Sequence, residues 1–433
     1  MRIGSLPTAA MARGLARAVA LCLAAASCAA IGAAAATRLT WLEVDAPVAM
    51  APLCHSIAAT AQSSGAIVDV WFEDLDRLVV KYQQNPLRAA RAYVYLATAM
   101  RDAWTLAAGP SCDSASAAAA AHLAAGRVVD LLYPQEPSMM WAAIGFGRSQ
   151  QQDAGRAATS AEGRAEVTVA ASPRPIADRI VTAVRMRMLV DGSEQRPPPE
   201  VSTRVVGRWV GTAPLYMALP AEPTADRWLT WSFGDIRALR PPPPPAIDSA
   251  AYRDEVIAVV RAREKLTARE REIADRWHLD QGSVTPAGVW NRIARERTRA
   301  ANLPERTRLE ALALLHAAMF DAFVAAWDAK LAYFTERPIT AIQRMVDPGF
   351  VPYLATPQFP SYVSAHAAVS GAAEVVLGRH LPNEATSFSA MAAEAADSRL
   401  YGGIHFPVDN REGLALGRRV AAHVLASAPT SAK

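Results

Sequence analysis

Apolar residues recur at helical spacing along most of the chain, and proline marks where that pattern stops. The pattern predicts helices over residues 56–108 (broken at Asn85-Pro86, with Pro86 opening a second helix), 115–132 and 155–189 (split near 173–175). The stretch 191–248 lacks this helical pattern and contains two proline runs, which cannot join helices or central strands. We expect these runs to form an ordered connection over the surface. Helical patterning resumes at Ala250 and continues to Ala428, so we expect a nearly all-α fold.

One short stretch occurs twice at helical positions. Residues 99–104 read Ala-Met-Arg-Asp-Ala-Trp and residues 318–323 read Ala-Met-Phe-Asp-Ala-Phe. One short match can arise by chance; a true repeat would indicate two related helical bundles. The expected divisions are a signal peptide over 1–36, an N-terminal helical bundle with the irregular proline-rich segment over 37–240, and a C-terminal helical bundle over 241–433.

The N-terminus has the features of an export signal. Basic residues precede an apolar stretch over 18–36, no acidic residue appears before Glu43, and Ala34 and Ala36 suit a signal peptidase. An uncleaved membrane anchor and a lipoprotein at Cys28 are the alternatives. We expect a periplasmic or secreted protein, with no other membrane span. In that compartment Cys54 and Cys112 either form a disulfide or stay as two buried thiols.

Composition narrows the function classes. About half of the 433 residues are hydrophobic, which allows a large core, and alanine dominates, which favours helices. The net charge of +4 is small for this length and the basic residues do not cluster, so no nucleic-acid partner is expected.

Three segments near the C-terminus carry residues suited to binding a tetrahedral oxyanion. The first is Lys330-Leu-Ala-Tyr-Phe-Thr-Glu-Arg337-Pro338, where a seven-residue spacing predicts Lys330 and Arg337 two turns apart on one helix face. By itself such a pair is more often a solvated basic face.

The second segment, Phe359-Pro-Ser-Tyr-Val-Ser-Ala-His366, precedes an apolar helix that ends near Gly378. Ser364 is placed to cap that helix, with Ala365 and His366 in its first turn, where backbone N–H groups attract anions. The third segment, Ser398-Arg399-Leu-Tyr-Gly-Gly-Ile-His405-Phe-Pro-Val-Asp409, predicts a helix start after His405. Asp409 would then bond one imidazole nitrogen and fix its tautomer. Alone, each segment also suits an ordinary helix cap with a surface histidine.

Together the three segments, in this order and spacing, resemble the signature of the vanadium haloperoxidases and the type 2 phosphatidic acid phosphatases. The resemblance covers the chain from about Asn85, most securely over 311–425, and implies an all-α fold of the haloperoxidase and acid-phosphatase type. The sequence departs from the family at Ala365, where a glycine is usual. Alanine keeps the backbone N–H group, but its methyl could crowd the anion.

The resemblance also implies roles for these residues. Lys330, Arg337 and Arg399 would bind the equatorial oxygens, with help from the Ser364 hydroxyl and the Ala365 N–H group. His405 would be the axial group, which is the vanadate ligand in a peroxidase and the nucleophile in a phosphatase. His366 would be the acid–base residue, and Asp409 would orient His405. One pocket suits both chemistries because five-coordinate vanadate resembles the transition state of phosphoryl transfer.

The surroundings favour a vanadate-dependent haloperoxidase that uses hydrogen peroxide to oxidise halide. The long region before the site resembles haloperoxidases, and Trp327 and Phe359 match aromatic positions near the site of fungal-type chloroperoxidases, although core packing explains them equally well. The alternatives are a soluble acid phosphatase, which needs no cofactor and cleaves a phosphate ester through a phosphohistidine at His405, and a non-catalytic helical scaffold. His316 is expected to be a satisfied helix residue.

Overall fold

The computed structural model describes residues 40–43, 67–108, 114–136, 174–197 and 205–429. In these ranges the chain is helical, and its only β-type pairing is an isolated bridge between Arg208 and Thr335. The predicted all-α fold is confirmed. The expected signal peptide, Cys54, Cys112 and the first half of the helix pair expected over 155–189 lie outside the described residues.

The first helices follow the expected boundaries. They are α2 (Ile67–Lys81), α3 (Pro86–Ala107), α4 (Ser114–Leu132) and α7 (Arg174–Val190). Asn85 caps α3 by accepting the N–H groups of Leu87 and Arg88, and Pro86 opens that helix as predicted. The stretch 191–248 is irregular apart from two 3₁₀ turns, η1 (Ala225–Arg227) and η2 (Ile236–Leu239).

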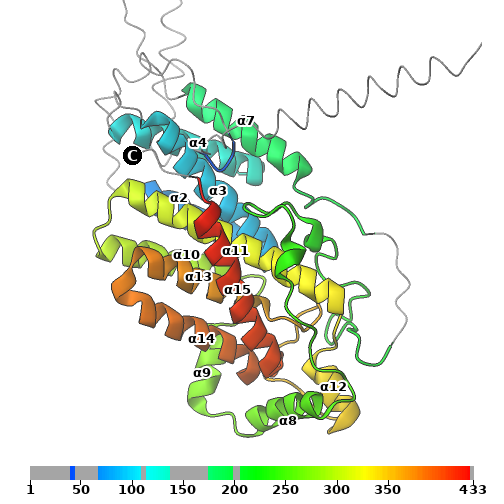
Figure 1. Ribbon diagram of the computed structural model, residues 1–433. Coiled ribbons are helices and arrows are strands. Elements are labelled where there is room, and N and C mark those ends of the chain that lie inside the picture. The colour runs from blue at the N-terminus through cyan, green and yellow to red at the C-terminus, as the bar shows by residue number, and fades with distance from the viewer. Residues whose placement is uncertain (1–39, 44–66, 109–113, 137–173, 198–204, 430–433) are drawn as a thin grey trace, which may run out of the picture.

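The second set of helices comprises α8 (Ala250–Glu264), α9 (Ala268–Arg276), α10 (Thr285–Ala300), α11 (Glu305–Tyr333), α12 (Pro338–Met345), α13 (Ala365–His380), η3 (Pro382–Glu384), α14 (Ala385–Tyr401) and α15 (Pro407–Ser427). Of these, α10, α13 and α15 pack against α11 (Figure 1). Within the described ranges, α11 is the one helix long and apolar enough to cross a membrane, and 94% of its apolar window is buried inside the protein. It is therefore built as the central core helix of this fold.

The proline run 241–245 is an ordered connection, as expected. Tyr333 and Tyr362 donate their hydroxyls to the carbonyl oxygens of Pro241 and Pro242, both at 2.6 Å. One hydrophobic core contains side chains from α2 through α15. The domain boundary expected at residue 240 stays a prediction.

The short sequence repeat has a structural counterpart. Asp102 of α3 accepts the backbone N–H groups of Trp41 and Leu42, and Asp321 of α11 accepts those of Trp231 and Ser232. Each donating pair follows a threonine, because the chain reads Thr-Trp at 40–41 and again at 230–231. The two tryptophan rings meet edge to face with centroids 6.4 Å apart. Two helices thus hold equivalent segments in the same way, which supports a duplicated architecture.

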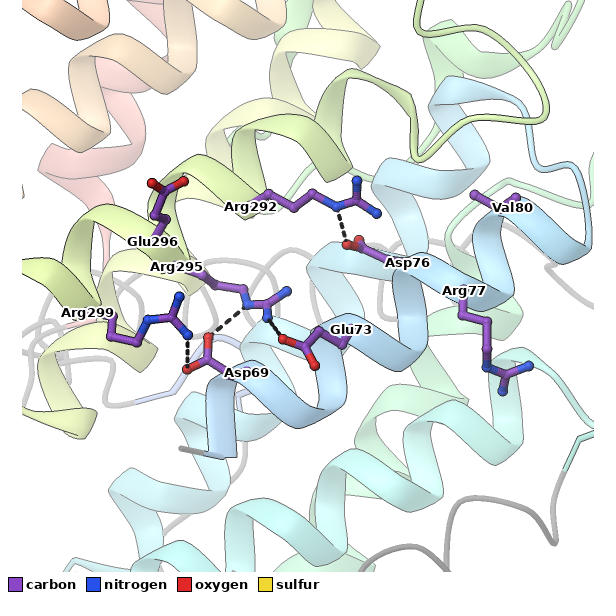
Figure 2. A pocket seen from close by; sticks show the side chains of 9 residues that line it. All are labelled: Asp69, Glu73, Asp76, Arg77, Val80, Arg292, Arg295, Glu296 and Arg299. Atoms are coloured by element: carbon purple, nitrogen blue, oxygen red, sulfur yellow. Dashed lines mark hydrogen bonds and ion pairs between the residues drawn. The ribbon is translucent and has the colours of Figure 1, made fainter. Parts of the chain in front are cut away.

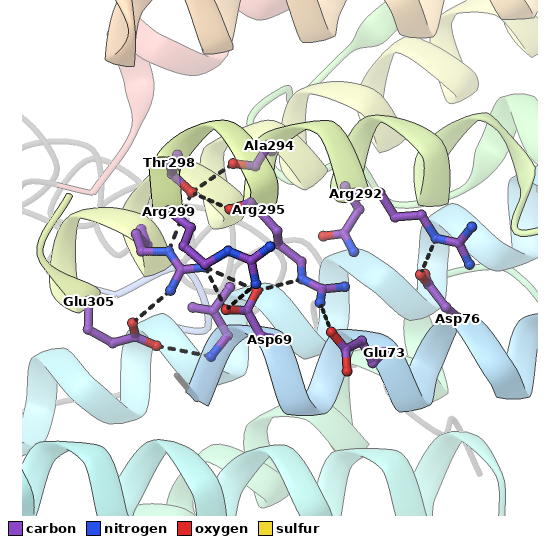
Figure 3. A network of polar contacts seen from close by, with 12 residues as sticks. Asp69, Glu73, Asp76, Arg292, Ala294, Arg295, Thr298, Arg299 and Glu305 are labelled. Atoms are coloured by element: carbon purple, nitrogen blue, oxygen red, sulfur yellow. Dashed lines mark hydrogen bonds and ion pairs between the residues drawn. The ribbon is translucent and has the colours of Figure 1, made fainter. Parts of the chain in front are cut away.

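An ionic network fastens α2 to α10 and α11. Asp69 accepts hydrogen bonds from Arg295 (3.0 Å) and, through both oxygens, from Arg308 (3.1 and 3.0 Å), while Asp76 accepts from Arg292 (2.7 Å). Figures 2 and 3 show Asp69 and Asp76 of α2 facing Arg292 and Arg295 of α10. These four side chains line a cavity of about 660 Å³. Because its acidic and basic side chains pair with one another, we interpret this cavity as part of the helix packing.

Candidate active site

The predicted residues converge at the ends of five helices. Lys330 lies in the last turn of α11, Arg337 caps α12, Ser364 caps α13, and Arg399 lies near the end of α14. His405 precedes α15 and Asp409 lies in its first turn. All six side chains are buried, at 3% exposure or less.

The expectation that Lys330 and Arg337 share one helix is wrong. The α11 helix ends at Tyr333, and Phe334 takes a left-handed conformation with φ of 52°. Arg337 is extended and opens α12, since the following Pro338 disfavours helical backbone at the residue before it. The two cations nevertheless meet, because the chain turns back over the segment 359–361. Lys330 Nζ donates to the backbone carbonyls of Pro360 (2.7 Å) and Ser361 (2.9 Å). Arg337 Nε donates to the backbone carbonyl of Phe359 (2.7 Å).

His405 has a defined tautomer. Its Nδ1 lies 2.9 Å from Oδ2 of Asp409, so the proton sits on Nδ1 and is donated to the carboxylate. Its Nε2 therefore carries a lone pair, which faces Nη1 of Arg337 at 3.0 Å. The predicted role of Asp409 in orienting His405 matches this geometry. A lone pair held in this way can act as a ligand or a nucleophile.

Ser364 caps α13 as predicted, since its Oγ accepts the N–H group of Ala367 (3.3 Å). Its own hydroxyl proton stays available to an anion. The Ala365 side chain is 4% exposed and belongs to the hydrophobic core. Its methyl therefore packs against the core, which argues against crowding of an anion.

Two buried donor or acceptor atoms at the site lack a partner among the described residues. They are Nη2 of Arg337 and Nε2 of His366. Arg399, by contrast, donates through Nη2 to the carbonyl of Trp277 at 2.6 Å. An unpaired buried polar atom is costly, so these two atoms indicate a missing polar ligand.

The electrostatics indicate the sign of that ligand. Burial lowers the pKa of Arg337 and of Arg399 to about 9. Burial and then Arg337 lower the pKa of Lys330 well below its usual value, and burial, Arg337 and Lys330 do the same for His405. Burial raises the pKa of Asp409 to about 6. Three buried cations thus face one carboxylate, and an anion would compensate the excess positive charge.

Two aromatic side chains form one wall of the site. The rings of Trp327 and Phe359 have centroids 5.0 Å apart, and Lys330 Nζ lies 5.0 Å from the centroid of Phe359. The indole N–H of Trp327 donates to the carbonyl of Ala221 (3.1 Å). These contacts agree with the interpretation that both residues belong to the core. They also place both rings beside Lys330.

Two residues that support the site, Ser361 and Trp277, were not predicted from the sequence. Ser361 Oγ donates to Oδ2 of Asp409 at 2.5 Å, and the Trp277 carbonyl anchors Arg399. Ser361 lies within a recognised segment and could have been found there. Trp277 is more than a hundred residues from Arg399, and no motif connects them. Among the described residues, no group of three or more His, Cys, Asp or Glu is arranged to hold a metal cation.

Comparison with known proteins agrees with this arrangement. Residues 310–387 and 379–432 match the family model of the VCPO second helical-bundle domain, which confirms the resemblance in its most secure region. No curated protein sequence gives a significant match.

Solved structures resemble the chain over most of its length. A bacterial vanadium-dependent iodoperoxidase is 25% identical with a TM-score of 0.69, covering 85% of this chain and 97% of that one. The holo form of a bacterial vanadium-dependent chloroperoxidase is 15% identical with a TM-score of 0.59, covering 80% and 91%. Its apo form is 14% identical with a TM-score of 0.60, covering 79% and 93%. The structure is all-α, with three buried cations beside His405. Its C-terminal part, residues 310–432, matches the VCPO second helical-bundle domain, and its fold is similar to that of the vanadium haloperoxidases.

Proposed function

We propose that this protein is a vanadate-dependent haloperoxidase that uses hydrogen peroxide to oxidise halide. The observation that carries the proposal is the cluster of three buried cations around His405, whose Nε2 lone pair faces Arg337. The iodoperoxidase similarity makes iodide, the most easily oxidised of the common halides, the first halide to test.

The residues present fit a bound vanadate. Arg337, Arg399 and Lys330 would neutralise its charge, and the unpaired Nη2 of Arg337 would gain an acceptor. The Ser364 hydroxyl and the Ala365 N–H group would add hydrogen bonds. His405 would hold the anion through Nε2 once Arg337 turns from that lone pair to the anion. When bound, vanadate supplies the Lewis-acid centre that activates hydrogen peroxide.

His366 is placed to move protons. Its Nε2 is buried without a partner, and its pKa is held well below the usual value by burial and then by Arg399. A neutral imidazole accepts a proton, so His366 would act as the base that deprotonates hydrogen peroxide and then as the acid that returns the proton.

The proposal is tested by assaying oxidation of iodide and bromide with hydrogen peroxide, before and after vanadate is added to the stripped protein. Hydrolysis of a chromogenic phosphate ester is measured beside it. Vanadate-dependent halide oxidation supports the haloperoxidase. Ester hydrolysis that vanadate inhibits, without halide oxidation, assigns the chain to the phosphatases. If neither activity appears and calorimetry detects no anion binding, the scaffold alternative stands.

Three variants separate the roles. His405→Ala should abolish vanadate-dependent activity, because it removes the imidazole nitrogen that would hold the anion. His366→Ala should keep vanadate binding and lower the rate by about 10²–10⁴-fold, as for a lost acid–base group. Arg399→Ala should weaken vanadate binding, because it deletes a charge-assisted contact. His423→Ala, at an exposed histidine, is the matched control and should leave both quantities unchanged.

We also propose that the chain is exported and that residues 1–36 are removed. The basis is the sequence alone. Intact mass of protein recovered from an exporting host decides this, and a mass that retains Met1 to Ala36 contradicts cleavage.

A further inference from the structure

A second cavity adjoins the site on the side of Asp409. Its volume is about 260 Å³. It lies between the end of the proline run, the start of α8 and the start of α15, and its lining includes Pro244, Ile247, Tyr252, Phe406, Val408 and Asp409. No role in anion binding explains this cavity, because the cations of the oxyanion pocket do not line it.

The walls of the cavity are apolar and aromatic. The rings of Tyr252 and Phe406 have centroids 5.6 Å apart. The two tyrosine hydroxyls at the cavity are already engaged, that of Tyr252 with Glu336 and that of Tyr362 with the Pro242 carbonyl, both at 2.6 Å. Arg208, which also lines the cavity, lies over the Phe334 ring, 4.9 Å from its centroid. These residues therefore offer mainly ring faces and aliphatic surface.

Two carboxylates that line the cavity are hydrogen-bond acceptors. Oδ2 of Asp409 accepts from Ser361, His405 and the Phe406 N–H group, whereas Oδ1 accepts no hydrogen bond from the described residues. Glu255 accepts the Val408 N–H group at 2.8 Å through one oxygen. A carboxylate oxygen has room for further donors, so Oδ1 of Asp409 can accept one from a molecule in the cavity.

We propose that this cavity binds a small uncharged aromatic molecule that carries one hydroxyl or N–H donor. The ring packs against Phe406, Val408 and the proline run, and the donor bonds Oδ1 of Asp409. The volume lies near the lower end for ligand pockets, so one ring with a short substituent fits. Two carboxylates, Glu255 and Asp409, outnumber the one cation at the lining, Arg208, so this cavity disfavours anions, unlike the cationic cluster at His405. The proposal does not depend on vanadate chemistry.

Calorimetry with the full chain tests the proposal directly. Phenol is the probe, toluene is its isostere without a donor, and benzoate is its anionic analogue. Phenol should bind once per chain and at least about tenfold more tightly than toluene, because toluene leaves the carboxylate oxygen unpaired. Benzoate should not compete with phenol.

Two substitutions locate the binding. Ile247→Trp should fill the cavity and Val206→Trp, at a rim residue that is 68% exposed, should obstruct it; both should lower phenol affinity at least about tenfold. Val351→Trp, at a residue that is 67% exposed and outside the cavity, should not. Because Val206 is exposed, that variant is expected to fold even if Ile247→Trp does not. Absence of phenol binding, equal affinity for phenol and toluene, or equal phenol binding by the Val206→Trp and Val351→Trp variants overturns the proposal. Binding of phenol without any halide oxidation would leave it standing and contradict only the proposed activity.

Discussion

Ser361 donates a 2.5 Å hydrogen bond to the same oxygen of Asp409 that accepts the proton of His405 Nδ1. The backbone strengthens the connection, since the Ser364 N–H group donates to the Asp409 carbonyl at 3.0 Å. The carboxylate that fixes the His405 tautomer is thereby tied to the segment that caps α13. Two of the three segments predicted to bind an anion are held together through Asp409.

The first prediction concerns Ser361→Ala. Burial raises the pKa of Asp409 to about 6, and the Ser361 hydrogen bond lowers it. Without the hydroxyl this pKa should rise further, so on acidification Asp409 is protonated, and His405 loses its orienting charge, at a higher pH. The acid limb of the activity profile should move upward by about one pH unit, the size expected for one bond to a charged group. Vanadate-dependent halide oxidation measured across pH 4–8 (roughly the window around this pKa) checks it.

Ser361→Thr is the matched control, because it keeps the hydroxyl. Its acid limb should stay near that of the wild type. If the alanine variant loses activity equally at every pH, Ser361 contributes only to structure and the electrostatic account is wrong.

The second prediction concerns the ionic network between α2 and the helices it packs against. The Asp69 side chain is 12% exposed and bonds both Arg295 and Arg308, whose side chains are 8% and 4% exposed. Asp69→Asn removes the counter-charge that Arg295 and Arg308 share and should lower the free energy of unfolding by about 3 kcal/mol. Chemical denaturation measures this. Asp235→Asn removes half of an exposed pair with Arg237 and should leave the free energy of unfolding nearly unchanged. Equal losses in the two variants would show that burial does not set the contribution.

Local signals in the sequence predicted much of this molecule. Asn85-Pro86, Ser364 and Pro407 each mark a helix start that the structure contains, because capping and proline geometry depend on neighbouring residues only. The prediction that Lys330 and Arg337 lie on one helix is wrong. The pair Arg337-Pro338 is itself a helix-start signal, and it indicates that the two cations lie on different helices.

Other features depend on contacts between distant segments and have no local signal. The carbonyl of Trp277 that anchors Arg399 is one, and the cavity beside Asp409 is another. Likewise, the equivalent packing of Trp41 and Trp231 became visible only when the two carboxylates that hold their segments were located. Tertiary packing decides these features, and a single sequence does not specify it residue by residue.

The third prediction concerns Ala365, where the family usually has glycine. Its methyl belongs to the core, and glycine would present the same backbone N–H group. Ala365→Gly should therefore change vanadate affinity by less than about threefold, while the loss of a helix-favouring residue lowers the free energy of unfolding by about 0.5–1 kcal/mol. Vanadate titration and denaturant unfolding measure the two quantities. A gain in affinity of more than about tenfold would show that the methyl crowds the anion.

The last prediction concerns the glycines that let α13 and α15 touch. A Cβ atom at Gly417 would lie 1.8 Å from the carbonyl oxygen of Ala368, and one at Gly413 would lie 2.5 Å from that of Ser364. Alanine at a helical glycine normally adds up to about 1 kcal/mol of stability, but a clash with backbone cannot be relieved by a rotamer change, and such overpacking costs about 1–3 kcal/mol. Gly417→Ala should therefore lower the free energy of unfolding. It should also push apart the helix starts that carry Ser364 and Asp409, and a displacement near 1 Å at a catalytic site can cost about 100-fold in rate.

Gly234→Ala is the control, because a Cβ atom there meets nothing within 4 Å. Unfolding and vanadate-dependent activity are measured on both variants. If Gly417→Ala keeps full activity and stability, the close contact between α13 and α15 does not position the site.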